Sequence, residues 1–286
     1  MLKIMECFGG VGACSMALRN LGINYEIVDY VEIDKYAVKS FNAIHGTNFE
    51  PQDICEWDKD IEVDLIMHGS PCQDFSLAGK QAGGDKDSGT RSSLMYETIR
   101  IVNKLKPKYV IWENVKNLLS KKHRHNFDAY LESMEQLGYN NYYQVLNAKD
   151  YGIPQNRERV FTISIKKDID KGSFCFPDKQ ELSLKLKDLL EDEVEDKYYL
   201  SEKLVNNLSK QEVYKSDISI PIKNGTKKGY LDAHNGDSVN IAYPNSKTRR
   251  GRVGNQVSQT ITTLDNMGVV VDDYSESSNK QIIDWR

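Results

Sequence analysis

Apolar and polar residues alternate in blocks over the first half of the chain. Short apolar runs of the kind found in buried strands occur at residues 3–7, 25–31, 65–67, 109–113, 142–147 and 160–165. Stretches with helical periodicity occur at residues 14–21, 35–45, 93–105 and 127–137. Strands that alternate with helices are typical of a doubly wound α/β domain built on a parallel sheet, and we predict that fold for residues 1–165.

The pattern changes after residue 165. Two Lys- and Glu-rich helices are expected at residues 182–190 and 201–208, followed by short, weak strands between residues 218 and 271 in a region rich in Gly, Asn, Ser and Lys. We therefore predict a second, smaller and irregular domain at residues 166–286.

Composition narrows the class of protein. The chain has five cysteines, an odd number, with no C-x-x-C pair and no Cys/His cluster at zinc spacing, which predicts a reduced cytoplasmic protein without a metal. Glu6 and the glycines that follow interrupt any signal-peptide core, and no apolar run approaches the ~20 residues that a membrane span needs. We expect no membrane association.

Charge is spread unevenly along the sequence, although the net charge is only −4. Residues 178–196 carry eight acids against three lysines, whereas residues 222–255 carry seven Lys or Arg against two acids. The basic segment predicts contact with phosphates, and it is equally compatible with a solvated surface loop.

Cys72 is the first candidate for chemistry. A short apolar run leads into Gly69-Ser-Pro-Cys72, and Pro71 fixes its own φ and restricts Ser70, so the thiol is held in a defined turn. A nucleophile placed after a strand is one interpretation. The other is a small buried apolar residue, the usual role of a free cysteine.

A second candidate site follows the first expected strand. Phe8-Gly-Gly-Val-Gly12 joins a strand to a helix, and Glu32 stands at the end of the next strand, where a carboxylate can accept hydrogen bonds from ribose hydroxyls. A tight turn without a ligand is the alternative. A nicotinamide-binding dehydrogenase would use the same turn and acid. Asp53 is an adenine-contact candidate, although an ordinary turn or capping acid is the simpler interpretation.

Three motifs occur in a fixed order: Pro71-Cys72-Gln73, Trp112-Glu113-Asn114-Val115 and Gln155-Asn-Arg-Glu-Arg159. With Phe8-Gly-x-Val-Gly12 before them and Thr90-Arg91-Ser-Ser-Leu94 between them, the chain resembles the cytosine-5 DNA methyltransferases of bacteria and phages. The resemblance implies a Rossmann-like, S-adenosylmethionine-dependent domain with a target-recognition domain. It also implies S-adenosylhomocysteine as product, duplex DNA as partner and a restriction-modification setting.

The resemblance implies a role for each matching residue. Cys72 would be the nucleophile, Glu113 would protonate ring nitrogen 3, and Arg159 would contact the base carbonyl with support from Arg157 and Gln155. The cofactor-binding set would be Phe8, Gly10, Val11, Gly12, Glu32, Ile33, Asp53, Ile54 and Pro71. The DNA-binding set would be Ser76, Arg91, Arg249, Arg250, Arg252, Thr260 and Ile261. For Glu113 a helix cap, for Arg157 and Arg159 surface ion pairs, and for Thr260 and Ile261 a plain strand are the alternatives.

The resemblance is weaker near the end of the sequence. The family's closing motifs, a final Gly-Asn-Ser-Val-like element among them, are not found before Arg286. We therefore expect a split or truncated enzyme completed by a second polypeptide. The alternatives are a DNA-binding subunit without turnover and an enzyme of this fold that methylates cytosine in RNA.

Overall fold

A computed structural model describes residues 1–71, 91–192, 194–210, 219–246, 248–261, 266–271 and 281–284. The chain forms two compact units. The first unit comprises Met1–Leu146 and Glu158–Pro177, and the second comprises Asn147–Arg157 and Asp178–Arg286. The domain boundary predicted after residue 165 lies near the end of the strand Glu158–Lys166. In the structure the chain returns to the first unit at Glu158 and passes into the second unit again at Asp178.

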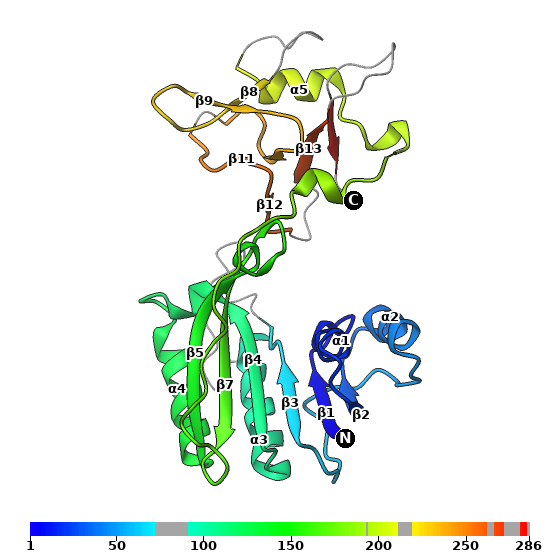
Figure 1. Ribbon diagram of the computed structural model, residues 1–286, viewed down its shortest axis with the longest axis vertical. Helices are drawn as coiled ribbons and strands as arrows, with labels where there is room; N and C mark the ends of the chain where they lie inside the picture. Colours follow the sequence, from blue (N-terminus) through cyan, green and yellow to red (C-terminus); the bar gives the residue numbers. More distant parts are fainter. Residues whose placement is uncertain are drawn as a thin grey trace. The chain divides into compact units, whose positions relative to one another are not determined.

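The first unit is built on a six-stranded sheet in the order β2-β1-β3-β4-β7-β5 (Figure 1). The strands are β1 (Leu2–Cys7), β2 (Tyr25–Val31), β3 (Leu65–His68), β4 (Tyr109–Val115), β5 (Tyr139–Asn147) and β7 (Glu158–Lys166). Neighbours β2, β1, β3 and β4 pair in parallel, whereas β7 runs antiparallel to β4. The predicted doubly wound α/β fold is confirmed, and β7 is the strand that departs from the parallel arrangement. No crossover helix precedes β7, so the chain returns beside β4 in the opposite direction.

Four helices connect the parallel part of the sheet. They are α1 (Ala13–Asn20), α2 (Lys35–His45), α3 (Met95–Leu105) and α4 (Arg124–Gln136), with 3-10 turns η1 (Arg91–Leu94) and η2 (Lys116–Leu119). Their ends follow local chemistry. The Asp34 carboxylate caps α2 by accepting from the N–H groups of Tyr36 and Ala37, and Gly46 ends it at a φ of 66°.

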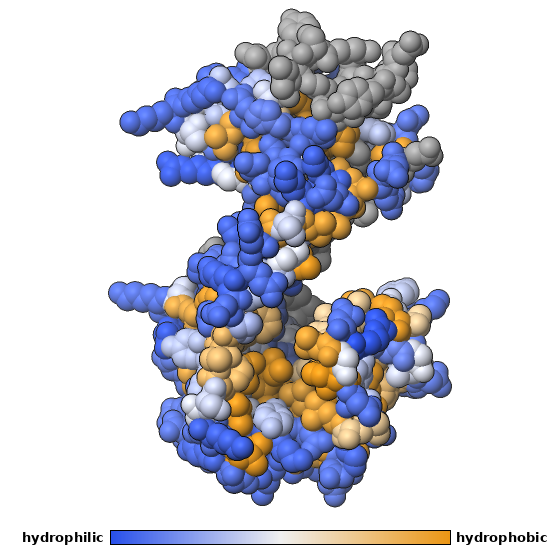
Figure 2. Space-filling view, in the orientation of Figure 1, coloured by the Kyte–Doolittle hydropathy of each residue, from blue (hydrophilic) through white to orange (hydrophobic). Residues whose placement is uncertain are grey.

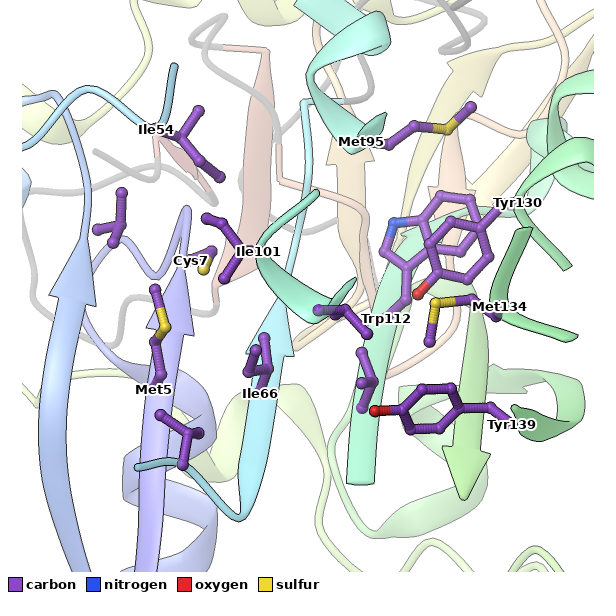
Figure 3. Close-up of a cluster of buried hydrophobic side chains, with 14 of the residues drawn as sticks. Met5, Cys7, Ile54, Ile66, Met95, Ile101, Trp112, Tyr130, Met134 and Tyr139 are labelled. Atoms are coloured by element: carbon purple, nitrogen blue, oxygen red, sulfur yellow. The ribbon is translucent and has the colours of Figure 1, made fainter. Parts of the chain in front are cut away.

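The main core lies between the sheet and α3 and α4 (Figure 3). Strand β4 shows how the sheet sorts its side chains. Val110, Trp112 and Asn114 are 0–1% exposed, whereas Ile111 and Glu113 alternate with them and are only half-buried. Successive strand residues point to opposite faces, so Trp112 anchors the core while Glu113 stays available on the other face. Apolar side chains also appear on the visible face of this unit (Figure 2).

The second unit has little regular structure. It contains α5 (Glu202–Leu208), a sheet in the order β11-β10-β13-β14, a β8–β9 hairpin and a parallel β6–β12 pair. The strands are β6 (Gln155–Asn156), β8 (Ile220–Lys223), β9 (Tyr230–Ala233), β10 (Ser238–Asn240), β11 (Val253–Gly254), β12 (Ser258–Gln259), β13 (Met267–Val271) and β14 (Gln281–Asp284). The 3-10 turns are η3 (Ala148–Tyr151), η4 (Leu186–Leu189) and η5 (Asp196–Tyr198).

One expected helix of this unit is wrong and the other is confirmed. Residues 182–190 form only the short turn η4, in which Leu186 is buried and its N–H donates to the Gln256 carbonyl. A single buried side chain gives no apolar face to stabilise a longer helix. The helix expected at residues 201–208 is present as α5, which buries Val205 and Leu208.

Candidate active site

The glycine turn after β1 has an unusual backbone. Phe8, Gly10 and Gly12 all have positive φ, at 55°, 56° and 81°. Such a φ costs a non-glycine residue about 1–3 kcal/mol, and this cost is typically met at functional sites. The Phe8 N–H donates to the Val31 carbonyl at 2.7 Å and the Tyr30 hydroxyl to the Gly10 carbonyl at 2.6 Å, so β2 holds the turn in place.

Gly12 can be nothing but glycine here. A Cβ at this position would collide with Phe41 and His45 of α2, and its φ lies in the left-handed region. Helix α1 begins immediately afterwards, with the Met16 N–H donating to the Gly12 carbonyl. The turn therefore presents its backbone close to whatever lies at the carboxyl end of β1.

Glu32 and Ile33 follow β2 beside this turn. The Glu32 carboxylate accepts from the Gly10 N–H at 3.3 Å and from the Asp34 N–H at 3.0 Å. Ile33 is 67% exposed and Val11 is 49% exposed, so two apolar side chains border the acid with nothing of the described chain covering them. An apolar edge next to a carboxylate at the end of β2 is an arrangement that suits an adenosine-containing cofactor.

Asp53 and Ile54 lie in the loop before β3. The Asp53 carboxylate accepts from the Cys55 N–H at 2.9 Å, as expected for a turn acid, and Asp53 is exposed. Ile54 requires a correction. Its side chain is 4% exposed in the main core, so it is not accessible to a cofactor in this structure.

Glu113 and Arg159 form an ion pair at the carboxyl end of β4. Arg159 Nε lies 2.8 Å from Glu113 Oε1, and the two side chains are 16% and 31% exposed. The antiparallel register explains their meeting, because Arg159 pairs with Val115 and Phe161 with Glu113. A Cβ added to Gly69 would lie 3.7 Å from Glu113 Oε2 and 4.0 Å from the Phe8 carbonyl oxygen. Three motifs distant in sequence thus meet at one edge of the sheet.

The chain that leads to residue 72 is tied to β4. Trp112 Nε1 donates to the Ser70 hydroxyl at 2.9 Å, and Asn114 Nδ2 donates to the Ser70 carbonyl at 3.3 Å. Pro71 follows, half-buried. Cys72 and Ser76 lie outside the described residues, and Arg91 begins η1. The turn therefore starts from a fixed point two residues before the cysteine.

The His68 side chain packs against Trp112, the residue that donates to Ser70. The His68 ring stacks on Trp112 at a centroid distance of 5.8 Å and an interplanar angle of 6°, and Nε2 lies 3.1 Å from the Tyr130 hydroxyl. Burial lowers the pKa of His68 to about 3, so the imidazole is neutral. Nothing in the sequence pattern distinguishes this histidine from a surface one.

Cys7, which is buried, and Cys14, which is partly buried, are poor nucleophiles. Burial raises the pKa of Cys14 to about 12, and it also raises the pKa of Cys7. A thiol that stays protonated near neutral pH is unreactive. Glu6, which accepts hydrogen bonds from the Ser15 N–H and hydroxyl, has its own pKa raised by burial. These groups stabilise the junction of β1 and α1.

Seven of the sequence-predicted residues lie in the second unit, and four of them belong to the Gln155 motif and the Thr260 element. Gln155 pairs with Ser258 in the β6–β12 ladder, and the Thr260 hydroxyl donates to the Asn156 carbonyl at 2.8 Å. The Arg157 N–H donates to the Asn147 side chain at 3.1 Å. Ile261 is 46% exposed. The structure thus brings the Gln155 motif and the Thr260 element together.

The three arginines predicted to contact DNA differ. Arg249 lies over the ring of Tyr243 at 5.5 Å, and Tyr243 is 74% exposed with a φ of 52°. Arg250 is exposed, and its Nε donates to the Gly225 carbonyl at 3.1 Å.

The structure does not support the predicted contact of Arg252 with DNA. Arg252 is 0% exposed, and its guanidinium donates to the carbonyls of Asn240, Ala242 and Tyr243 at 2.5–3.0 Å. A buried guanidinium engaged in this way cannot contact a phosphate, so Arg252 holds the Tyr243 loop instead. Sequence spacing could not separate it from Arg249 and Arg250.

Comparison with known proteins agrees with this geometry. The family model for C-5 cytosine-specific DNA methylase matches residues 2–282. The chain belongs to this family. It is similar to the type II methyltransferase M2.ScrFI of Lactococcus lactis subsp. cremoris, with 36% identity over 262 residues that cover 72% of each chain.

Two further similarities define its extent. The orphan methyltransferase M.SPRI of Bacillus phage SPR is 37% identical over 242 residues, which cover 73% of this chain and 54% of the phage protein. The chain therefore spans between half and three quarters of these relatives. A prophage-encoded DNA modification methyltransferase structure from E. coli covers 99% of this chain and 86% of its own, with a TM-score of 0.62 at 18% identity, which shows a shared fold.

The described residues contain neither a membrane-spanning helix nor a metal-binding cluster. None of the helices they form is long and apolar enough to cross a membrane. Within the same ranges, no group of three or more His, Cys, Asp or Glu side chains is arranged to hold a metal ion.

Proposed function

We propose that the chain transfers a methyl group from S-adenosylmethionine to carbon 5 of cytosine in duplex DNA. The observation that carries the proposal is the Glu113–Arg159 pair beside Gly69, at the point where the chain turns toward Cys72. Family membership supports it. A dehydrogenase would use the glycine turn and Glu32 but has no role for this pair.

The nucleophile in this proposal is Cys72. Carbon 5 of cytosine is too weak a nucleophile to take a methyl group by itself, so a thiolate first adds to carbon 6 and its electron pair enters the ring. Carbon 5 would then bond to the methyl carbon that a bound S-adenosylmethionine supplies, and the bond from that carbon to the donor sulfur would break. A base removes the carbon-5 proton, and the carbon–sulfur bond breaks to release the thiolate. The Trp112 and Asn114 hydrogen bonds to Ser70 support a fixed approach for the thiol.

Glu113 and Arg159 are proposed to manage the charge that the addition creates. A carboxyl group at ring nitrogen 3 donates a proton there, and a guanidinium at the ring carbonyl stabilises negative charge on oxygen. The 2.8 Å contact between them keeps both groups oriented before a base arrives. Such preorganised electrostatics typically provides a large part of an enzyme's rate enhancement.

The cofactor site fits S-adenosylmethionine by two observations. Phe8, Gly10 and Gly12 form a strained turn that exposes backbone, and Glu32 stands beside it next to the exposed side chain of Ile33. We assign Glu32 to the ribose hydroxyls and the exposed carboxylate of Asp53 to the adenine amino group. When bound, the cofactor supplies an electrophilic methyl group on its sulfonium.

DNA would be bound in part by the second unit. Cytosine inside a duplex is stacked, so the target nucleotide must leave the helix at a cost of a few kcal/mol that protein contacts offset. Arg250 is exposed and Arg249 is partly exposed, so both are cations suited to phosphate, and Tyr243 adds an exposed aromatic ring. Thr260 and Ile261 are proposed to lie near the extruded base.

A labelled-methyl assay tests the proposal. The purified 286-residue chain is incubated with methyl-labelled S-adenosylmethionine in two separate reactions. One reaction contains unmethylated duplex DNA and the other contains transfer RNA. We expect label at carbon 5 of cytosine in DNA only. Label in RNA alone would establish the RNA alternative, and no label on either would contradict the proposal. The second polypeptide expected from the sequence receives no support from the relatives, and activity of the chain alone would eliminate it.

A further inference from the structure

The loop that carries Asp53 is fixed by side chains and not by a strand or helix. Residues 52–59 contain only one short turn, in which the N–H groups of Glu56 and Trp57 donate to the carbonyls of Asp53 and Ile54. The loop nevertheless occupies the edge of the proposed adenine site. Two charged residues outside it, Asp29 and Arg100, make most of its anchoring contacts.

A β-bulge directs Asp29 toward this loop. The pairing of β1 with β2 skips a residue between Ile4↔Ile27 and Met5↔Asp29, so Val28 is the extra residue. A bulge changes which face of the sheet the following side chains occupy, and bulges are common next to active sites. Here it aligns Asp29 with Met5, on the face where the main core lies.

Asp29 is a buried carboxylate, 2% exposed, whose partners come largely from the loop. It accepts from Gln52 Nε2 at 2.9 Å and from Trp57 Nε1 at 2.7 Å, and it pairs with Lys59 Nζ at 2.9 Å. Burial alone would raise the pKa of Asp29, but these hydrogen bonds outweigh it and lower that pKa. The carboxylate is therefore ionised and joins both ends of the loop.

Arg100 holds the loop from α3. Its Nη1 donates to the Trp57 carbonyl and its Nη2 to the Ile54 carbonyl, both at 2.9 Å, while its Nε donates to Glu97 at 2.7 Å. The guanidinium fork thus spans the single turn of the loop. Ile54 packs at the Cys7 and Ile101 end of the core, so the turn cannot rotate away from α3 (Figure 3).

We propose that Asp29 and Arg100 are positioning residues that hold Asp53 in place for the adenine end of the cofactor. The inference rests on the proposed function. Neither residue contacts the cofactor. Gln52 completes the link, because its N–H donates to the Glu32 carbonyl at 2.9 Å, and the ribose acid and the adenine acid are thereby held in one hydrogen-bonded unit.

Binding of S-adenosylhomocysteine by the intact chain tests this, with calorimetry as the readout and DNA binding measured in parallel. Arg100→Met removes both carbonyl bonds, and we expect at least about tenfold weaker S-adenosylhomocysteine binding with unchanged DNA affinity. The melting temperature should fall, because the Ile54 and Trp57 carbonyls lose their donor. KM for S-adenosylmethionine should rise while kcat and KM for DNA stay the same. Amide exchange at residues 55–57 should become faster.

Lys104→Met is the matched control. Lys104 lies one turn later on α3 and bonds only to the exposed Asp58, so its loss should leave cofactor affinity unchanged. A folded Arg100→Met protein that binds S-adenosylhomocysteine like the unaltered chain would overturn the proposal.

Two further results are decisive. If Arg100→Met does not fold, Arg100→Lys keeps the charge and loses the fork, and unchanged affinity in that variant would also overturn the proposal. If the unaltered chain binds no S-adenosylhomocysteine, the proposed function fails, and the amide exchange of residues 55–57 in the variant still decides whether Arg100 orders the loop.

Discussion

The two units use charged side chains in opposite ways. In the first unit a six-stranded sheet and its helices fix the backbone, and charged groups such as Glu113 and Arg159 remain partly exposed at the carboxyl edge. In the second unit most strands are two to five residues long, and buried polar groups take over the structural role. Arg252 and Asp237 there bond to loop backbone. A charge change at Glu113 or Arg159 should therefore impair chemistry, whereas loss of the charge at Arg252 should impair folding of the second unit.

The largest expected effect is a loss of methyl transfer from a change in the first unit that leaves folding intact. Cys72→Ser should lower methyl transfer at least about 10³-fold, because no other group replaces the thiolate, while DNA affinity and melting temperature stay the same. A steady-state methylation assay measures it. Cys175→Ser, which changes an exposed cysteine of the first unit, is the control and should be silent. Retained activity in Cys72→Ser would remove Cys72 from the mechanism.

Glu113→Gln tests the ion pair. The amide keeps the shape and loses the carboxylate, so kcat should fall about 10²–10³-fold with a melting temperature within a few degrees of the unaltered chain. Arg159→Met should cause a similar loss, and the double variant should lose less than the product of the two single losses because the residues act together. Independent, multiplicative losses would show that the pair is not one functional unit.

Arg252→Met should break folding of the second unit. Three loop carbonyls lose the buried guanidinium that donates to them, and we expect about 2–4 kcal/mol of destabilisation, measured by denaturant unfolding and by faster amide exchange in residues 240–243. Arg250→Met makes the same chemical change at an exposed position and should cost little. Equal stability of the two variants would contradict the structural role assigned to Arg252.

His68 makes the stability of the first unit depend on pH. Its pKa is about 3 in the folded chain and near 6.5 when unfolded, so the unfolded chain binds the extra proton between these values. Its stabilising contribution is complete above pH 6.5 and falls as the pH drops toward 3, by up to ~1.4 kcal/mol per pH unit. His68→Phe should flatten the decline of melting temperature over that range. An unchanged slope would show that the imidazole is not responsible.

The smallest effect is on DNA binding. Arg249→Gln and Arg250→Gln should each weaken duplex affinity several-fold at moderate salt and reduce the slope of log affinity against log salt by about 1. Stability should not change. Lys197→Gln, at an exposed position of the acidic segment, is the control. A salt slope that stays constant would place the DNA contacts elsewhere.

Sequence predicted the first unit well because periodicity reports on burial in a regular sheet. The strands, the glycine turn and the order of Cys72, Glu113 and Arg159 could be identified in the sequence. The antiparallel direction of β7 could not. The second unit was predicted poorly for a physical reason. Its strands are too short for alternation to register, and whether Arg252 is buried or exposed depends on distant carbonyls. The structural role of Asp29 could not be predicted from the sequence either, because a β-bulge in the β1–β2 pairing sets the direction of its side chain.

The most direct test uses duplexes with 5-fluorocytosine in place of cytosine at random positions, incubated with the intact chain and S-adenosylmethionine. Fluorine at carbon 5 cannot leave as a proton, so the adduct with the enzyme persists. We predict a covalent protein–DNA complex whose digestion yields the nucleotide attached to the sulfur of Cys72. Attachment at another residue, or no complex from a chain that methylates ordinary DNA, would contradict the account.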